Sequence, residues 1–254
     1  MILILSPSKT LAKIEIQPRI DPTQPDFLNK SEILINRLRE LNVNDLKGLM
    51  GISQSLATLN FERFLKWQTP FTKQNSYPAL LSFKGDVYAG IDVVDFSADD
   101  FLFAQQNLRI LSGLYGVLRP LDLMQPYRLE MGTKVDVESS NNLYDFWRDT
   151  ITRYFEGLIK LDKENTLVNL ASNEYSKAIN FNKIGGTIVT PVFKEQKGDS
   201  LKTIAIYAKR ARGLMTRFVI KNKLEQAEHL KAFTDEGYVY APDYSKGNNW
   251  VFIR

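Results

Sequence analysis

The sequence contains no cysteine and a single histidine, His229. Without cysteine the chain can form no disulfide, use no thiolate nucleophile and build no cysteine-based zinc or iron–sulfur site, so we expect no disulfide-linked partner. His229 lies in the polar stretch 226–230 and is interpreted as a solvated side chain. A metal site would depend mainly on carboxylates, and no suitably spaced carboxylate cluster is visible. The sequence therefore predicts no metal site and no cofactor.

Long apolar runs are also absent. The opening run, Met1 to Leu5, is far shorter than the roughly 18 apolar residues of a membrane-spanning helix. It also lacks the basic region and the cleavage site of a signal peptide. We therefore expect a cytoplasmic protein without a membrane partner, in which this run is a buried strand.

The composition is that of a globular protein with a sizeable core, because 44% of the 254 residues are apolar and 24% are charged. Strand and helix patterns alternate irregularly, and no linker or repeat divides them. We predict a single domain over residues 1–254, of the α/β (or α+β) class, with a mixed sheet flanked by helices. The expected strands cover 1–5, 166–170, 187–193 and 203–207, with turn and strand at 86–96; the expected helices cover 28–41, 44–50, 53–67, 98–113, 143–161 and 208–224, and a loop covers 17–27.

The segment 207–223 carries basic residues without any acidic residue. On a helical wheel these bases share one half, opposite a packed apolar face. Such a face can follow the phosphates of a nucleic acid, although a solvated basic helix gives the same pattern. Like charges on one helix face cost stability, which favours a phosphate partner. The bases are Lys209, Arg210, Arg212, Arg217, Lys221 and Lys223.

Two glycines, Gly113 and Gly116, follow the predicted helix that begins after Ser97. A helix, a Gly-x-x-Gly turn and a short basic segment together resemble a helix-hairpin-helix, which holds DNA phosphates through backbone N–H groups. A helix that ends at a glycine and continues into a turn fits the same residues.

Polar residues follow the predicted strands, where open α/β sheets bind ligands. Lys9 follows the first strand, and Glu174 follows the strand at 166–170. Lys84 and Asp86 flank Gly85. Turns, helix caps and an Arg128–Glu130 salt bridge would explain each of these features separately, whereas together they would line one cleft.

These segments resemble the signature blocks of the YaaA family of peroxide-stress proteins, in the order of that family and over most of the chain. The blocks are Ser6 to Thr10, Phe83 to Tyr88, Leu111 to Gly132, Asn169 to Tyr175 and Tyr207 to Phe218. Ser8 is a departure, because the family motif has alanine there. The resemblance implies a basic cleft, a helix-hairpin-helix-like element and binding of double-stranded DNA with little sequence preference. It also implies a role in limiting oxidative damage driven by free iron.

Two functions follow from these observations. The first is a DNA-binding protein of the peroxide-stress response; the second is an enzyme acting on a nucleotide, a nucleobase or a related small anion in the same cleft. The expected DNA- or anion-binding residues are Lys9, Lys84, Arg109, Gly113, Gly116, Arg119, Arg128, Lys209, Arg210, Arg212 and Arg217, with Asp86, Glu130 and Glu174 as possible cleft acids. We expect Lys9, Lys84 and Arg128 to converge on one anion site, with Asp86 and Glu130 offsetting their mutual repulsion.

Overall fold

The strand β1 (Ile2–Leu5) lies in the middle of the main sheet, and all four of its residues are buried. We describe residues 1–15 and 20–254 in a computed structural model. The other strands are β2 (Thr10–Leu11), β3 (Tyr77–Pro78), β4 (Phe83–Lys84), β5 (Leu108–Ser112), β6 (Gly116–Leu118), β7 (Leu123–Met124), β8 (Thr166–Asn169), β9 (Thr187–Lys197), β10 (Ser200–Lys202), β11 (Val239–Tyr240) and β12 (Asn249–Ile253). The α-helices are α1 (Leu28–Arg39), α2 (Val43–Met50), α3 (Gln54–Lys66), α4 (Ala79–Ser82), α5 (Asp86–Ile91), α6 (Ala98–Asn107), α7 (Leu143–Leu161), α8 (Asn173–Ser176) and α9 (Ala205–Asn222). Short 3₁₀ helices are η1 (Val93–Asp95), η2 (Phe181–Lys183), η3 (Ala227–Ala232), η4 (Asp235–Gly237) and η5 (Pro242–Tyr244).

The main sheet is mixed, and its strand order is β11-β12-β9-β8-β1-β5-β6, with β10 beside β9. β1 runs parallel to both β5 and β8, and β9 runs parallel to both β8 and β12. β6, β10 and β11 are antiparallel to their neighbours. The continuous apolar run of β1 is typical of a parallel strand that is buried on both faces. The predicted α/β class with a mixed sheet and flanking helices is confirmed.

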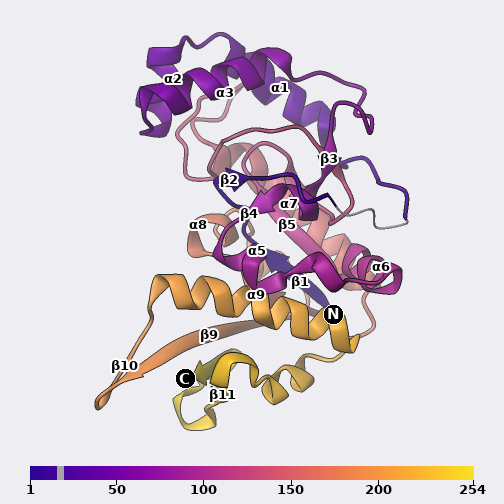
Figure 1. Cartoon of the computed structure of the whole chain (residues 1–254), viewed down its shortest axis with the longest axis vertical. Coiled ribbons are helices and arrows are strands. Elements are labelled where there is room, and N and C mark those ends of the chain that lie inside the picture. Colours follow the sequence, from indigo (N-terminus) through magenta and orange to yellow (C-terminus); the bar gives the residue numbers. More distant parts are fainter. Residues whose placement is uncertain (16–19) are drawn as a thin grey trace.

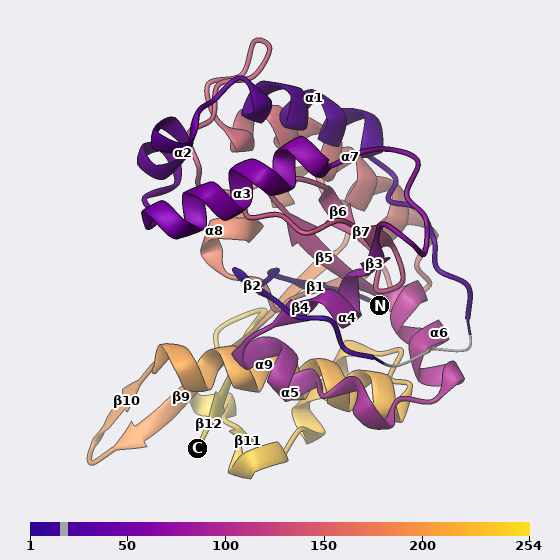
Figure 2. The same ribbon diagram turned by 45° about the horizontal axis from the view of Figure 1, so that its top comes forward.

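Helices cover this sheet and extend beyond it. α1, α2 and α3 lie together at one end of the molecule, while the β9–β10 hairpin projects at the other end (Figures 1 and 2). Among the described helices, none is long and apolar enough to cross a membrane.

Most of the predicted helices are confirmed, and four of them, α2, α3, α6 and α7, begin at a side-chain cap. The Ser53 side chain accepts the N–H of Leu56 at the start of α3. Ser97 and Asp100 form the expected capping box at the start of α6. The predicted strands at 1–5, 166–170 and 187–193 correspond to β1, β8 and β9. Of the predicted loop at 17–27, residues 17–19 lie outside the described part of the chain.

Three predicted elements are wrong. The helix expected to continue to Gly113 ends at Asn107, and the next residues form β5, which pairs with β1. Residues 86–91 form α5 instead of turn and strand. The strand expected at 203–207 is absent from this described segment, because α9 already begins at Ala205. For β5 and α5 a tertiary contact, with β1 and with α9 respectively, decides between helix and strand where the sequence pattern allows both.

The helices α5 and α9 cross at two glycines. A Cβ on Gly213 would lie 1.9 Å from the carbonyl oxygen of Val87, and a Cβ on Gly90 would lie 2.4 Å from that of Arg210. No side chain fits between the two backbones at this crossing. The close packing fixes α5, and with it the preceding turn at Gly85, against the body of the protein.

Candidate functional site

The carboxyl ends of the parallel strands β1 and β8 lie side by side, and the loops that follow them are joined. The Oγ of Ser6 accepts the backbone N–H of Ser172 at 2.8 Å and lies 3.1 Å from its Oγ. Tyr88, on α5, donates its hydroxyl to the carbonyl oxygen of Ser6 at 3.1 Å. The loop after β1 is therefore held from two directions. This edge of the sheet is where α/β proteins bind ligands.

Three charged side chains meet beside these loops, and we call them the Lys9–Glu130–Arg128 cluster. The Oε1 of Glu130 is 3.4 Å from the Nζ of Lys9 and 3.0 Å from an NH2 nitrogen of Arg128. The Lys9 side chain is 60% exposed, whereas those of Arg128 and Glu130 are 17% and 14% exposed. The lysine thus reaches toward solvent above a carboxylate and a guanidinium that are largely covered.

The cluster keeps unused hydrogen-bonding capacity. Arg128 Nε and Glu130 Oε1 are both buried and have no hydrogen-bond partner among the described residues. The two ion-pair contacts of Glu130 are close in distance but lack hydrogen-bond geometry. A buried N–H donor without an acceptor is costly, and in native proteins it usually has an explanation. An anionic ligand would supply the missing acceptor for Arg128.

Lys84 adjoins the cluster through its backbone. In the β2–β4 pair Thr10 lies opposite Lys84, and Ser8 donates its hydroxyl to the carbonyl oxygen of Lys84. Gly85 has a φ of 140°, which favours glycine, and a Cβ there would lie 2.9 Å from the Ser8 Oγ. The side chain of Lys84 is exposed, and no ion pair to it or to Asp86 is found in the described part of the chain. Of the three cations expected to converge, Lys9 and Arg128 both contact Glu130, but the described residues show no ion pair or hydrogen bond that brings the Lys84 side chain to them. The offsetting role expected for Asp86 is not found either.

Glu174 connects the loop after β8 to the segment that carries the cluster. Its Oε1 accepts the backbone N–H of Gly132 at 3.2 Å, and Tyr144 donates its hydroxyl to the Glu174 carbonyl oxygen at 2.8 Å. A Cβ on Gly132 would lie 3.2 Å from this carboxylate oxygen. Glu174 thus acts here as a support for residues 128–132.

Buried tyrosines lie close to these carboxylates and to one another. Burial raises the pKa of Tyr175, and nearby Tyr127, Glu174 and Glu130 raise it further. Burial and Tyr127 likewise raise the pKa of Tyr88. These phenols therefore remain protonated at neutral pH and can donate hydrogen bonds. The sequence analysis did not select Tyr127 and Tyr175 as site residues, although each directly adjoins a residue that it did select.

The helix-hairpin-helix prediction is wrong. Residues 108–118 form the antiparallel strands β5 and β6 joined by a tight turn, and every one of them is buried. A Cβ on Gly113 would lie 2.3 Å from the Leu129 carbonyl oxygen, and a Cβ on Gly116 would lie 2.6 Å from the Trp147 ring. These glycines permit close internal packing, so the turn cannot present its backbone N–H groups to a DNA phosphate.

Two of the expected cleft arginines have internal partners. Arg109 is 5% exposed, donates to Tyr154 Oη at 2.6 Å, and donates through NH1 to carbonyl oxygens at the end of α6. Arg119 pairs with Asp122 at 3.0 Å and with Asp26 at 3.3 Å. Both arginines hold the fold together at places where the sequence analysis expected a ligand.

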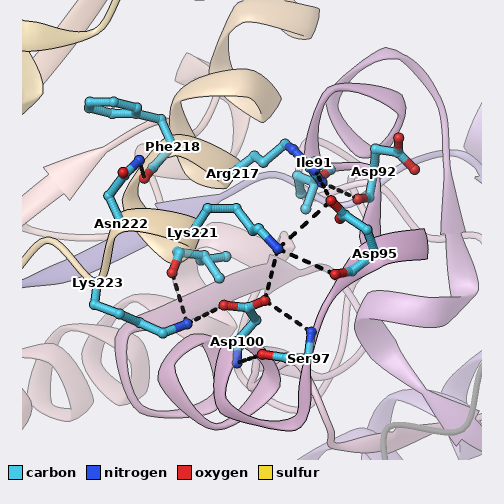
Figure 3. Close-up of polar contacts among 11 residues, drawn as sticks. Ile91, Asp92, Asp95, Ser97, Asp100, Arg217, Phe218, Lys221, Asn222 and Lys223 are labelled. Atoms are coloured by element: carbon cyan, nitrogen blue, oxygen red, sulfur yellow. Dashed lines mark hydrogen bonds and ion pairs between the residues drawn. The ribbon is translucent and has the colours of Figure 1, made fainter.

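The basic face of α9 is largely neutralised by acids from other elements (Figure 3). Arg217 pairs with Asp95 at 2.6 Å, Lys221 contacts both Asp95 and Asp100, and Lys223 contacts Asp100. Arg210 likewise pairs with Glu236 at 2.6 Å. The α9 segment contains no acidic residue, but most of its basic side chains are nevertheless paired with acids from other parts of the fold.

Two bases of α9 differ from the others. Lys209 is exposed and Arg212 is half-buried, and the described residues contain no ion-pair partner for either. Burial lowers the pKa of Arg212. Arg212 is therefore less accessible than its wheel position indicated. Within the described residues there is also no group of three or more His, Cys, Asp or Glu side chains that could hold a metal ion.

Comparison with known proteins gives consistent matches. A family model described as peroxide stress protein YaaA matches residues 1–244. The chain is 50% identical to a UPF0246 protein of Ralstonia nicotianae and 48% identical to one of Saccharophagus degradans. It is 46% identical to a UPF0246 protein of Hahella chejuensis. Each of these alignments covers 100% of this chain and 99% of the relative.

Proposed function

The chain belongs to the family of the peroxide stress protein YaaA, and we propose that it acts in the peroxide response by binding a small anion at the Lys9–Glu130–Arg128 cluster. The ligand class is a nucleotide, a nucleobase derivative or a related small anion. The observation that supports this proposal is the buried Arg128 Nε, which has no acceptor among the described residues. A guanidinium binds phosphate and carboxylate groups through paired N–H donors.

The surroundings of the cluster also favour a small ligand. Lys9 is exposed and free to move onto a bound anion, since its contact with Glu130 is long, at 3.4 Å. We therefore assign anion binding to the two cations.

Calorimetric titration with adenosine monophosphate, inorganic phosphate and free adenine tests this proposal. We expect Arg128→Gln to weaken binding of the anionic probes at least about tenfold, because a charge-assisted hydrogen bond is lost. The matched control is Arg148→Gln, since Arg148 is exposed on α7. Glu130→Gln should retain or tighten binding, because it removes a negative charge next to the ligand.

Equal affinity of the wild-type protein and Arg128→Gln for every anionic probe would exclude the proposed site. Thermal midpoints measured without ligand show whether each variant is folded. A variant that binds weakly but unfolds at the wild-type temperature supports a binding role for Arg128.

Double-stranded DNA is the second candidate ligand, and exposed lysines favour it. Lys9, Lys84 and Lys209 are exposed, and the latter two have no ion pair within the described ranges. Binding through such contacts would show little sequence preference, and log affinity would fall by about 0.9 per phosphate contact with each log unit of salt. Filter binding with a 20-base-pair duplex (about two turns) and its scrambled form tests this, and a salt-independent affinity would argue against it.

Variants separate the exposed bases from those already paired. We expect Lys84→Gln and Lys209→Gln to reduce the salt dependence, whereas Arg217→Gln, whose partner is Asp95, should change it little. Arg212→Ala should weaken DNA binding without unfolding the protein if Arg212 reaches a phosphate. An effect of the protein on iron-driven damage would act through such a ligand, because the sequence offers no cysteine and one histidine for direct ligation.

A further inference from the structure

A second concave region shares none of the three residues of the Lys9–Glu130–Arg128 cluster, although its lining residues Leu11 and Pro126 lie two positions from Lys9 and Arg128 in the sequence. It is a cavity of about 360 Å³, bounded by the chain after β2, the last turn of α3, residues 73–77 and the segment around β7. This volume lies in the range of sites that hold small organic molecules. We propose that this cavity binds a small organic anion with a flat apolar body and a carboxylate or phosphate group.

The charge of the cavity supports an anionic ligand. Lys13, Arg63 and Lys73 line it, and none of the described lining residues is acidic. Lys73 pairs with Asp21 at 2.8 Å on the exposed side. Arg63 has no carboxylate partner in the described ranges.

Arg63 is the central residue of this proposal. It is half-buried on α3, and its one described hydrogen bond joins NH1 to Asn60 Oδ1 at 3.3 Å. A guanidinium has five N–H donors, so most of its donors remain free. Taking such a group partly out of water without a counter-charge is costly, and a bound anion offsets that cost. Burial accordingly lowers the pKa of Arg63.

Three other polar side chains of the wall are already hydrogen-bonded to backbone carbonyl oxygens. Ser76 donates to the Thr72 carbonyl oxygen at 2.6 Å, and Ser82 donates to that of Pro78 at 2.9 Å. Asn75 donates to the Pro70 carbonyl oxygen at 3.0 Å. These bonds fix the wall before any ligand arrives, which leaves the cations as the main donors for a ligand.

An aromatic ring supplies the apolar surface. The Nζ of Lys13 lies 4.8 Å from the centre of the Tyr77 ring, and Tyr77 donates its hydroxyl to the Ile14 carbonyl oxygen at 2.9 Å. Leu11 and Met124 also line the cavity. A planar ligand can therefore lie on apolar surface while its anionic group meets Arg63 and Lys13.

Calorimetric titration with phenyl phosphate, benzoate, inorganic phosphate and benzyl alcohol tests the proposal. We expect phenyl phosphate or benzoate to bind, inorganic phosphate to bind more weakly because it lacks the apolar body, and neutral benzyl alcohol not to bind. Arg63→Gln should weaken binding at least about tenfold. Lys66→Gln is the matched control, because Lys66 is an exposed base on the same helix outside the cavity.

Three results would overturn the proposal: benzyl alcohol binding as tightly as benzoate, no binding of either aromatic anion, or equal losses in Arg63→Gln and Lys66→Gln. If Arg63→Gln does not fold, Lys13→Gln takes its place with the same expectation. Because the Lys9–Glu130–Arg128 cluster would also take small anions, each titration is repeated in the Arg128→Gln background. Binding that persists there and is lost on adding Arg63→Gln belongs to this cavity, so the two proposals can fail separately.

Discussion

Replacing Asp100 by alanine removes two kinds of interaction at the start of α6. The carboxylate accepts the backbone N–H of Ser97 at 2.9 Å, which completes the capping box. It also contacts Lys221 at 3.1 Å and Lys223, while only 7% of its own side chain is exposed (Figure 3). The capping bond contributes about 1 kcal/mol. Because both lysines are about one-third exposed, each ion pair adds only about 0.5 kcal/mol.

We therefore expect Asp100→Ala to lower the free energy of unfolding by about 2 kcal/mol, or about 4–8 °C in the thermal midpoint. Asp99→Ala is the matched control, because Asp99 is exposed in the same first turn of the same helix. It loses the same charge near the helix N-terminus without a capping bond. Urea unfolding followed by tryptophan fluorescence measures both variants. Equal losses in the two variants would refute the assignment of these contacts to Asp100.

The same substitution has a predictable pH dependence. Burial acts to raise the pKa of Asp100, but hydrogen bonds from Lys223, the Ser97 backbone and Lys221 outweigh it and hold the pKa well below its usual range. The stabilisation is therefore complete above the unfolded pKa of about 3.9 and is lost as the pH falls through the folded pKa. We expect the stability gap between wild type and Asp100→Ala to shrink below about pH 4. A gap that stays constant from neutral pH down to about pH 2 would contradict this explanation.

Two further substitutions test the packing. Gly213→Ala should destabilise the protein by at least about 2 kcal/mol, because the new Cβ would lie 1.9 Å from the Val87 carbonyl oxygen. Gly157→Ala in α7, where the new Cβ would meet no atom within 4 Å, should instead stabilise the protein by about 0.5–1 kcal/mol. If the thermal midpoints of Gly213→Ala and Gly157→Ala moved in the same direction, the close packing of α5 on α9 would be refuted. Ser112→Ala should cost about 2 kcal/mol in urea unfolding, because Ser112 Oγ accepts the buried N–H of Tyr115 at 2.9 Å; an unchanged midpoint would show that this bond contributes nothing.

Features that depend on neighbouring residues could be predicted from the sequence. Ser53 and Ser97 are recognisable as caps because each side chain bonds to a backbone group only three residues away. The buried strand β1 was recognisable from its apolar run alone. Both signals are local, so no knowledge of the tertiary fold was needed.

Residues 108–112 show where local patterns fail. Leu108 and Leu111 have the spacing of a helix face, but a strand buried on both faces places apolar residues at every position and so contains that spacing too. Pairing of Leu108 with Leu3 decides for the strand, and this partner is more than a hundred residues distant. The chain order alone does not reveal that pairing.

The charge of α9 was misjudged for a similar reason. The repulsion between its bases was weighed only against acids within the helix, at spacings where side chains on one helix can meet. Asp95 lies 122 residues before its partner Arg217, and Asp100 lies 121 residues before its partner Lys221, yet they supply the compensating charges. A basic helix face is therefore evidence for a polyanion only after acids from the rest of the fold have been placed.

The candidate site around Lys9, Arg128 and Glu130 has some features that local sequence signals predict and others that depend on tertiary contacts. The position of Lys9 could be anticipated, because it follows the parallel strand β1, and loops after parallel strands open at the same edge of a sheet. The 127–132 segment follows β7, which pairs with β3 outside the main sheet, so its approach to Lys9 could not be predicted in this way. The role of Gly113 could not be predicted from the sequence, because it depends on a tertiary contact. Since Gly113 has no Cβ, the Leu129 backbone can approach it closely. That approach places Arg128 and Glu130, on either side of Leu129, beside Lys9. The glycine that suggested a phosphate-binding hairpin thus supports the proposed anion site indirectly, by positioning the segment that carries Arg128 and Glu130.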